Sequence, residues 1–332
     1  MAAPATQQIE TLKESHWTAR RHGLITELCE RGVTMTPAIR SLSHYSNGIL
    51  DFAVIRAERV PLISLVTESD DERRDEALPG SRLLLCAQDL GAVLNPLGTG
   101  ELMRTVVANE RAGLYGARAT PGEFVAAATD IPGGTPAMDE AMNALITRIR
   151  DEVYSLPDEL LGGDRSARPA ANARDAGAVA SVEFGTAAAQ DPDYEQRLRD
   201  LWRAHVNTTD LHYAGYYRDW TLVCVGDVFE SDALGPRFTN VSVRARRTAY
   251  RDLSRTLRGH LVRLTDALGL IVSAPVDRLV LDVQQGAVCV LWTSPREFLL
   301  GVTLDQRRVG EAERRLSGLA RALEGVRQPP PR

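Results

Sequence analysis

Apolar and polar positions alternate most regularly in the C-terminal part of the chain. Short apolar runs predict five strands there, at Leu211–Tyr217, Trp220–Phe229, Arg278–Gln284, Ala287–Thr293 and Phe298–Leu304. Apolar residues at helical spacing predict three helices, at Asp191–Val206, Arg244–Leu268 and Val309–Leu323. The order is helix, two strands, helix, three strands, helix. It predicts an α+β unit in which a five-stranded antiparallel meander is flanked by helices.

The N-terminal half has a less regular pattern, which also predicts an α+β region. Helices are predicted at Thr6–Arg31, Glu101–Gly116 and Pro136–Tyr154, and strands at Ile49–Arg56, Val60–Thr67 and Ser81–Ala87. The pattern predicts these elements without a topology, and this half resembles no family.

The change of composition near the middle of the chain predicts a domain boundary. Residues 157–180 are rich in Ala, Gly, Pro, Asp and Arg and lack aromatic residues, which is typical of a flexible linker. The predicted domains are therefore residues 1–156 and 181–326. The prolines in residues 327–332 predict an extended, disordered tail, because proline cannot continue the preceding helix.

The C-terminal elements are similar in order and length to the roadblock (dynein light chain) family and its longin relatives. The closing stretch "FLLGVTLDQRRVGEAERRLSGLARAL" resembles the last strand and helix of that family. The resemblance covers about two fifths of the chain and contains no diagnostic motif, and the segment from Glu230 to Val243 is longer than the family's loops. Profilin-like and GAF or PAS sensor folds share much of this order. The roadblock resemblance implies dimerisation and binding of a small Ras-like GTPase.

Composition narrows the functional classes. A hydrophobic fraction of 44% and a charged fraction of 25% are those of a soluble globular protein, and a net charge of −5 predicts no nucleic-acid or membrane footprint. The start "MAAPATQQIETLKESHW" lacks a secretory pattern, so we expect a cytoplasmic protein. Lys13 is the single lysine, which leaves none in the body of the chain for a Schiff base or a phosphate anchor.

The spacing of nucleophiles and metal ligands predicts no catalytic residue, metal or cofactor. The six histidines have no metal-site spacing, the four cysteines form no CxxC pair, and no GxSxG motif occurs. His205, Asp210 and His212 form the densest polar stretch, which also suits an ordinary helix end. An enzyme whose site assembles from residues of both halves remains an alternative.

One glycine-rich stretch could bind an anion. In "NPLGTGELMR", Gly98, Thr99 and Gly100 could present backbone N–H groups to a phosphate, although GK[ST] and the full GxGxxG are missing. The alternative interpretation is a loop in which Thr99 caps a helix that begins at Glu101.

Two other clusters suit protein binding. "VRARRTAYR" places four arginines around one predicted helix start: Arg244, Arg246, Arg247 and Arg251. "LHYAGYYRDW" gathers four aromatic residues in one hairpin: Tyr213, Tyr216, Tyr217 and Trp220. The alternatives are a solvated helix face for the arginines, and a core face for Tyr213 and Tyr217 with Tyr216 opposite them.

Together these features favour a non-enzymatic, cytoplasmic adapter protein. We expect it to bind itself as a homodimer and to bind a second protein, with a small GTPase as the candidate that the resemblance suggests. A small-molecule or nucleotide sensor and an enzyme with a site between the halves are the alternatives. Nucleic acid and membrane are not expected as partners.

Overall fold

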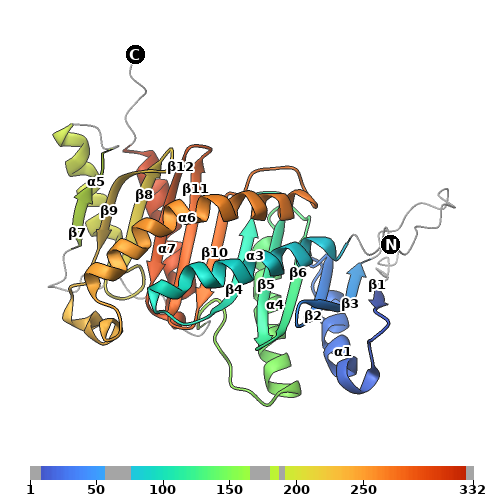
Figure 1. The fold of residues 1–332 in the computed structure, drawn as a ribbon. Helices are drawn as coiled ribbons and strands as arrows, with labels where there is room; N and C mark the ends of the chain where they lie inside the picture. Colours follow the sequence, from blue (N-terminus) through green and yellow to red (C-terminus); the bar gives the residue numbers. More distant parts are fainter. Residues whose placement is uncertain (1–8, 57–75, 165–179, 187–190, 327–332) are drawn as a thin grey trace, which may run out of the picture. The chain divides into compact units, whose positions relative to one another are not determined.

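The computed structural model describes residues 9–56, 76–164, 180–186 and 191–326, which form two compact units (Figure 1). Unit 1 consists of Met1–Leu90, Arg104–Glu159 and His260–Val276, and unit 2 consists of Gly91–Met103, Leu160–Gly259 and Asp277–Arg332. The predicted strand Val60–Thr67, most of the predicted linker and the predicted tail lie outside the described residues.

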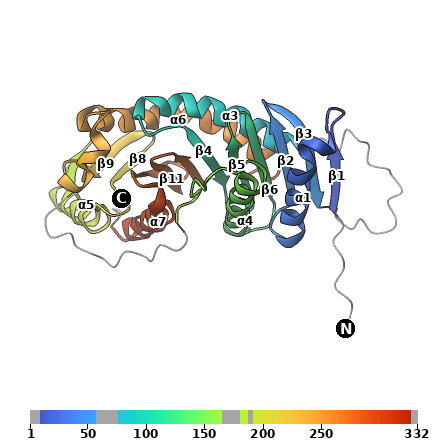
Figure 2. The ribbon, with the colours of Figure 1, turned by 90° about the horizontal axis from the view of Figure 1, so that it is seen from below.

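In unit 1, the described strands form an antiparallel sheet in the order β1-β3-β2-β6-β5-β4. Their bounds are β1 Ile9–Lys13, β2 Ser41–Ser46, β3 Ile49–Arg56, β4 Leu102–Ala108, β5 Gly113–Thr120 and β6 Glu123–Thr129. The helices are α1 Ala19–Met35, α3 Leu78–Leu94, α4 Thr135–Arg148 and the short η2 Ile149–Val153. Helices α1 and α4 pack together on one face of this sheet and α3 covers the other (Figure 2).

In unit 2, the described strands follow the order β7-β9-β8-β12-β11-β10. Their bounds are β7 Ser181–Phe184, β8 Tyr213–Arg218, β9 Thr221–Asp227, β10 Arg278–Val283, β11 Gly286–Ser294 and β12 Glu297–Thr303. The helices are α5 Pro192–His205, α6 Val243–Gly269, α7 Val309–Glu324 and the short η1 Asn95–Leu97, η3 Asp232–Phe238 and η4 Gln306–Arg308. Helices α5 and α7 pack on one face, and the first part of α6 covers the other.

The two units repeat one fold within a single chain. Each contains, in order, a strand, a helix, two strands, a helix, three strands and a helix. From β4 to α4, each residue of the first copy has its counterpart in the second copy at a constant spacing. Arg104 corresponds to Arg278, which gives a spacing of 278 − 104 = 174 residues. Arg104 pairs with Ala117 as Arg278 pairs with Leu291, and both copies carry a bulge near the end of their middle strand. The N-terminal half therefore shares the element order on which the family resemblance of the C-terminal half was based.

The first hairpins of the units also correspond. Glu123 pairs with Ser46 as Glu297 pairs with Arg218, so Tyr45 and Tyr217 occupy equivalent positions. Each hairpin has a bulge immediately before that tyrosine. The short strands β1 and β7 pair with β3 and β9 in the same way. These matches in register show that the repeat extends over all the sheet strands of the described residues.

The α+β class with an antiparallel sheet is confirmed, and every element predicted in the C-terminal half is present with small shifts at its ends. Strand β7 was not predicted. In addition, β8 lies between β9 and β12, so the sheet departs from a simple meander by one long connection.

The N-terminal elements were predicted less well. The predicted strand Ser81–Ala87 is part of helix α3, and the predicted helix Glu101–Gly116 is β4 with the start of β5. The predicted helix Thr6–Arg31 contains β1 and then part of α1, while β2 and β6 were missed. Strand β4 is buried from Met103 to Ala108, so its two faces show no alternation and its spacing also fits a helix.

Candidate protein-interaction site

An open groove of about 640 Å³ runs beside the first turns of α6 in unit 2. Most of its lining is apolar or small: Val93, Pro96, Leu97, Ser242, Arg244, Ala245, Thr248, Ala249, Asp252, Leu253 and Thr256. All of these residues belong to unit 2, on the end of α3, on η1, on α6 and at Ser242 just before it. The groove is therefore a property of this unit alone.

The local sequence explains why the groove stays open. Ala245 and Ala249 place small side chains where larger ones would fill it. Ser242 caps α6, because its Oγ accepts a hydrogen bond of 3.2 Å from the backbone N–H of Ala245. Opposite α6, η1 ends at Gly98, which has a φ of 61° and lies so close to Val241 that a Cβ would be 2.6 Å from its side chain.

Two charged residues line the groove, Arg244 and Asp252, and both are exposed. Arg244 is exposed and forms no ion pair within the described part of the chain. A cation in the first turn of a helix opposes the helix dipole, so the helix itself does not stabilise Arg244 in this place. Asp252, further along α6, is 3.3 Å from Arg255 and is partly neutralised by it. The groove thus combines a largely apolar lining with the guanidinium of Arg244, which forms no ion pair with a described residue.

The other three predicted arginines have different surroundings. Arg247 donates two hydrogen bonds of 2.7 Å to the carboxylate of Asp227, and Arg251 pairs with Glu183. Arg246 is buried, with its guanidinium carbon 4.9 Å from the ring centre of Phe238, and burial lowers its pKa. The four arginines therefore do not form one surface, and Arg244 is the member that lines the groove.

The predicted aromatic cluster is divided between core and surface. Tyr213, Tyr216 and Tyr217 are all buried, because β8 is a central strand covered by α6 on one side and by helices on the other. The ring of Tyr213 is 5.3 Å from that of Tyr250 on α6. The core interpretation thus describes these three tyrosines. Trp220 is half-buried at the β8–β9 turn, with a φ of 65° that few bulky residues adopt.

The predicted anion loop is held by the turn between β10 and β11. The backbone oxygen of Thr99 accepts a hydrogen bond of 3.0 Å from the N–H of Gln285, and the N–H of Glu101 donates to the side chain of Gln284. A Cβ on Gly100 would be 2.4 Å from Gln284. The predicted helix after Thr99 is a strand, so the helix dipole invoked for Gly98, Thr99 and Gly100 is not there, and anion binding stays a prediction.

Three of the histidines that looked scattered in the sequence converge in unit 1. His16, His22 and His44 surround the carboxylate of Asp51 in unit 1. His212 is buried in unit 2, where its Nδ1 accepts a 2.9 Å hydrogen bond from the N–H of Leu304 and burial lowers its pKa to about 4. Sequence spacing could not reveal the cluster in unit 1, because its members come from separate elements that the fold brings together.

Within the described segments, no set of three or more His, Cys, Asp and Glu side chains has the arrangement of a metal site. No helix among them has the length and apolar character needed to span a membrane.

Comparison with known proteins gives only distant similarities. No protein-family model and no curated protein matches the sequence. The solved structures that match in part include MglB with a tetrameric arrangement and the gliding protein MglB from Thermus thermophilus. Each is 20% identical and covers 42% of this chain, with a TM-score of 0.30, while the match covers 98% and 99% of those chains. A likeness at this level carries no argument about function.

Proposed function

We propose that this protein is a regulatory adapter that binds a helical segment of a partner protein in the groove of unit 2. The observation that carries the proposal is the largely apolar groove along α6, with the exposed Arg244 as part of its lining. An amphipathic helix buries its apolar face in such a groove, and a carboxylate on its edge pairs with the guanidinium. Burial of apolar area supplies the affinity and Arg244 supplies orientation.

The partner class proposed first is a small GTPase, on the basis of the resemblance of the element order to the roadblock family. A small-molecule sensor is the second candidate, because the groove volume lies within the range of about 300–1,000 Å³ that is typical of ligand pockets. The two candidates use the same residues, so one set of variants tests both.

We also propose self-association through unit 1. Leu85 on α3 and Val262 on α6 are 61% and 60% exposed, large values for aliphatic side chains on neighbouring helices. The two helices are joined beside them by the ion pair of Arg263 with Asp89. A second copy that covered both residues would remove this apolar area from water.

The groove is tested with Ala249→Arg, which fills it, and with Arg244→Glu, which reverses its charge. Arg258→Glu is the matched control, since Arg258 is exposed on the same helix, lies outside the groove lining and faces the ring of Trp220. Binding is measured by biolayer interferometry against a panel of small GTPases in their GDP and GTP states. We expect both groove variants to weaken binding at least about tenfold, with the control unchanged. Equal binding by all variants would refute the groove as the site.

Self-association is tested separately by light scattering after size-exclusion chromatography. The double variant Leu85→Arg with Val262→Arg is expected to convert a dimer to a monomer. Met35→Arg is the control, because Met35 is 76% exposed at the end of α1, another element of unit 1. A monomeric wild-type chain would end the self-association proposal and leave the groove proposal standing.

A further inference from the structure

The histidine cluster of unit 1, defined as His16, His22, His44, Asp51 and Glu123, joins five elements of the fold. His16 lies in the segment between β1 and α1, His22 on α1, His44 on β2, Asp51 on β3 and Glu123 on β6. Apart from the half-exposed His16 and the partly buried Glu123, its side chains are removed from water. The cluster thus connects the start of α1 to the middle of the sheet.

Asp51 is the centre of the cluster. Its Oδ2 accepts hydrogen bonds from Ser46 Oγ at 2.6 Å and from His44 Nδ1 at 2.8 Å, and its Oδ1 accepts one from His16 Nε2 at 3.0 Å. Burial opposes ionisation of Asp51, but these hydrogen bonds outweigh it and lower its pKa to about 2. Asp51 is therefore an anion at any pH near neutral.

His44 is held between two carboxylates. Its Nδ1 faces Asp51, and its Nε2 lies 3.2 Å from Glu123 Oε2, which also accepts a hydrogen bond from Tyr154. A carboxylate accepts hydrogen bonds and does not donate them, so both ring nitrogens of His44 carry protons. Burial opposes this charge, but the bonds to Asp51 and Glu123 raise the pKa of His44 above its ordinary value.

His22 is in the opposite state. Its Nδ1 accepts a 3.1 Å hydrogen bond from the backbone N–H of Thr18, the residue before α1, so its proton lies on Nε2 and the ring is neutral. Its buried Nε2 points toward Asp51 Oδ1 at 3.5 Å without a hydrogen bond. Burial lowers the pKa of His22, with Arg21 and His44 acting in the same direction and Asp51 and Glu123 against it.

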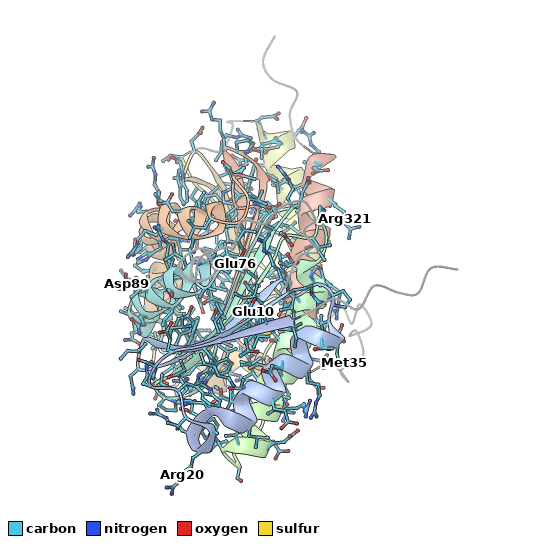
Figure 3. All side chains as sticks on the ribbon, turned by 90° about the vertical axis from the view of Figure 1, so that its right-hand side faces the viewer. Glu10, Arg20, Met35, Glu76, Asp89 and Arg321 are labelled. Carbon is cyan, nitrogen blue, oxygen red and sulfur yellow. The ribbon has the colours of Figure 1, made fainter. Side chains whose placement is uncertain are left out.

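The charged and titratable groups that act on His22 are thus Asp51, Arg21, His44 and Glu123. Arg21 follows Arg20 in the first turn of α1; Figure 3 shows Arg20 pointing away from the body of the protein. Tyr154 acts on the cluster through Glu123, and its own pKa is raised by burial and by that carboxylate.

Unit 2 has no such cluster at the equivalent place. Strand register makes Tyr216, Val223 and Glu297 the counterparts of His44, Asp51 and Glu123. There Glu297 is neutralised by Arg218 at 2.8 Å, a cation at all accessible pH values. His44 and Asp51 are therefore particular to unit 1, and the fold itself does not require them.

The segment Glu14–Thr18 depends on this arrangement. The N–H of Glu14 donates to the backbone oxygen of Asp51 at 3.0 Å, and Trp17 Nε1 donates to Thr26 on α1 at 3.1 Å. No side chain of the N-cap residue Thr18 caps α1, and no acidic residue lies in its first turn. The bond from the Thr18 N–H to His22 therefore ties the N-cap residue to a side chain of α1.

We propose that the histidine cluster is a proton-operated latch that holds the segment Glu14–Thr18 on unit 1 near neutral pH and releases it on mild acidification. One proton added at His22 Nδ1 converts the acceptor of the Thr18 N–H into a donor, so two N–H groups then face each other. Thr18 must withdraw, and the segment loses the contact that ties its C-terminal end to α1. The surface uncovered by this release is a second, pH-dependent state of unit 1.

The sign of the effect follows from linkage. The closed state requires neutral His22, so its folded pKa is below the ordinary value of 6.5. Closing is fully favourable above about 6.5 and weakens as pH falls below it. The opening equilibrium therefore rises as pH falls from 7.5 to 5.5, and about tenfold is the upper limit that one proton can give over this range.

The test is hydrogen exchange by mass spectrometry on the full-length protein, at several pH values from 7.5 to 5.5, with rates corrected for intrinsic exchange. We expect the opening equilibrium of peptides covering Glu14–Thr18 to rise as pH falls, by up to about tenfold. The start of α5 is an internal control, because it is capped by the carboxylate of Asp191, which accepts from the backbone N–H of Asp193 at 3.0 Å. Its exchange should remain constant over this range.

His22→Asn keeps an acceptor for Thr18 and cannot titrate, so it should abolish the pH dependence. His260→Asn is the matched control, since His260 lies in unit 1 outside the cluster and also has a pKa lowered by burial. An unchanged acid response in His22→Asn, or no acid response in the wild type, overturns the proposal. If His22→Asn does not fold, NMR titration of the wild-type histidines decides: the latch requires that His22 titrates together with the opening.

Discussion

The repeat places an arginine–carboxylate ion pair at equivalent positions of the two units, with different exposure to water. This difference predicts that loss of the pair lowers the stability of the two units by unequal amounts. Arg104 on β4 pairs with Asp139 on α4, and Arg278 on β10 pairs with Glu313 on α7, at equivalent positions. The side chains are 1% and 12% exposed in the first pair and 21% and 23% exposed in the second. The first pair is therefore buried, while the second retains contact with water.

We predict that Asp139→Ala destabilises unit 1 by about 3–5 kcal/mol, the usual cost of breaking a buried ion pair. Asp139 also accepts a 3.0 Å hydrogen bond from Asn143, whose Oδ1 accepts one of 2.8 Å from Tyr115. The substitution therefore also removes the acceptor of the Asn143 side chain. Glu313→Ala should cost about 1 kcal/mol, because solvent screens the second pair. The predicted difference is at least about 2 kcal/mol.

The assay is urea denaturation at pH 7, with hydrogen exchange to assign each transition to its unit. For a urea slope of about 1–3 kcal/mol/M, Asp139→Ala should lower the midpoint of unit 1 by at least about 1 M. Replacing both partners, Arg104→Met with Asp139→Leu, should recover part of the loss, since the desolvated charges are gone together. Equal costs for Asp139→Ala and Glu313→Ala would refute burial as the origin of the difference.

Two further predictions concern unit 2. Burial holds His212 neutral and lowers its pKa to about 4, so this unit should lose roughly 3 kcal/mol of stability as pH falls from about 6.5 to 4. Urea midpoints at several pH values measure this loss, and His212→Asn should remove most of it. An identical loss in the variant would assign the effect to other groups. Gly286→Ala should destabilise unit 2 by more than the roughly 1–3 kcal/mol of backbone strain alone, because Gly286 has a φ of 146° and a Cβ there would be 2.0 Å from the oxygen of Thr303. Gly259→Ala is the control and should leave stability equal or higher, because no atom lies within 4 Å of its new Cβ. Thermal melts that rank the two variants the other way would contradict this.

The C-terminal elements were predictable because each carries its own local signal. Gln285-Gly286 marks a turn, and Asp191 caps α5 as its sequence suggests. The run Ser81–Ala87 gave a wrong answer because it was considered alone. Leu83, Leu90 and Leu94 have the helical period and are buried, so a longer window indicates α3.

The internal repeat had a signal in the sequence that spacing could have revealed. Pro121, Glu123, Phe124 and Thr129 recur as Pro295, Glu297, Phe298 and Thr303, in "PGEFVAAAT" and "PREFLLGVT". Few other positions are identical, because a core tolerates many apolar residues of similar volume. A search for self-similarity at a fixed spacing would have extended the C-terminal fold to the N-terminal half.

The candidate sites were less predictable than the fold. Arg244 was selected from its sequence neighbourhood, but the helix places its neighbours Arg246 and Arg247 in other surroundings. The histidine cluster depends on contacts such as His44 with Glu123, 79 residues apart in the chain. Contacts at such distances leave no local pattern.

Each unit is made of chain segments that are far apart in the sequence, which determines when it can be completed during synthesis. Unit 1 includes residues up to Val276, and unit 2 takes Gly91–Met103 from the early part of the chain. Domains often fold in order as they leave the ribosome, the N-terminal one first. Here unit 1 is complete only after its last segment, His260–Val276, has been translated. All six described strands of unit 1 are made before that point, and what they lack until then is the last part of α6 and the segment after it.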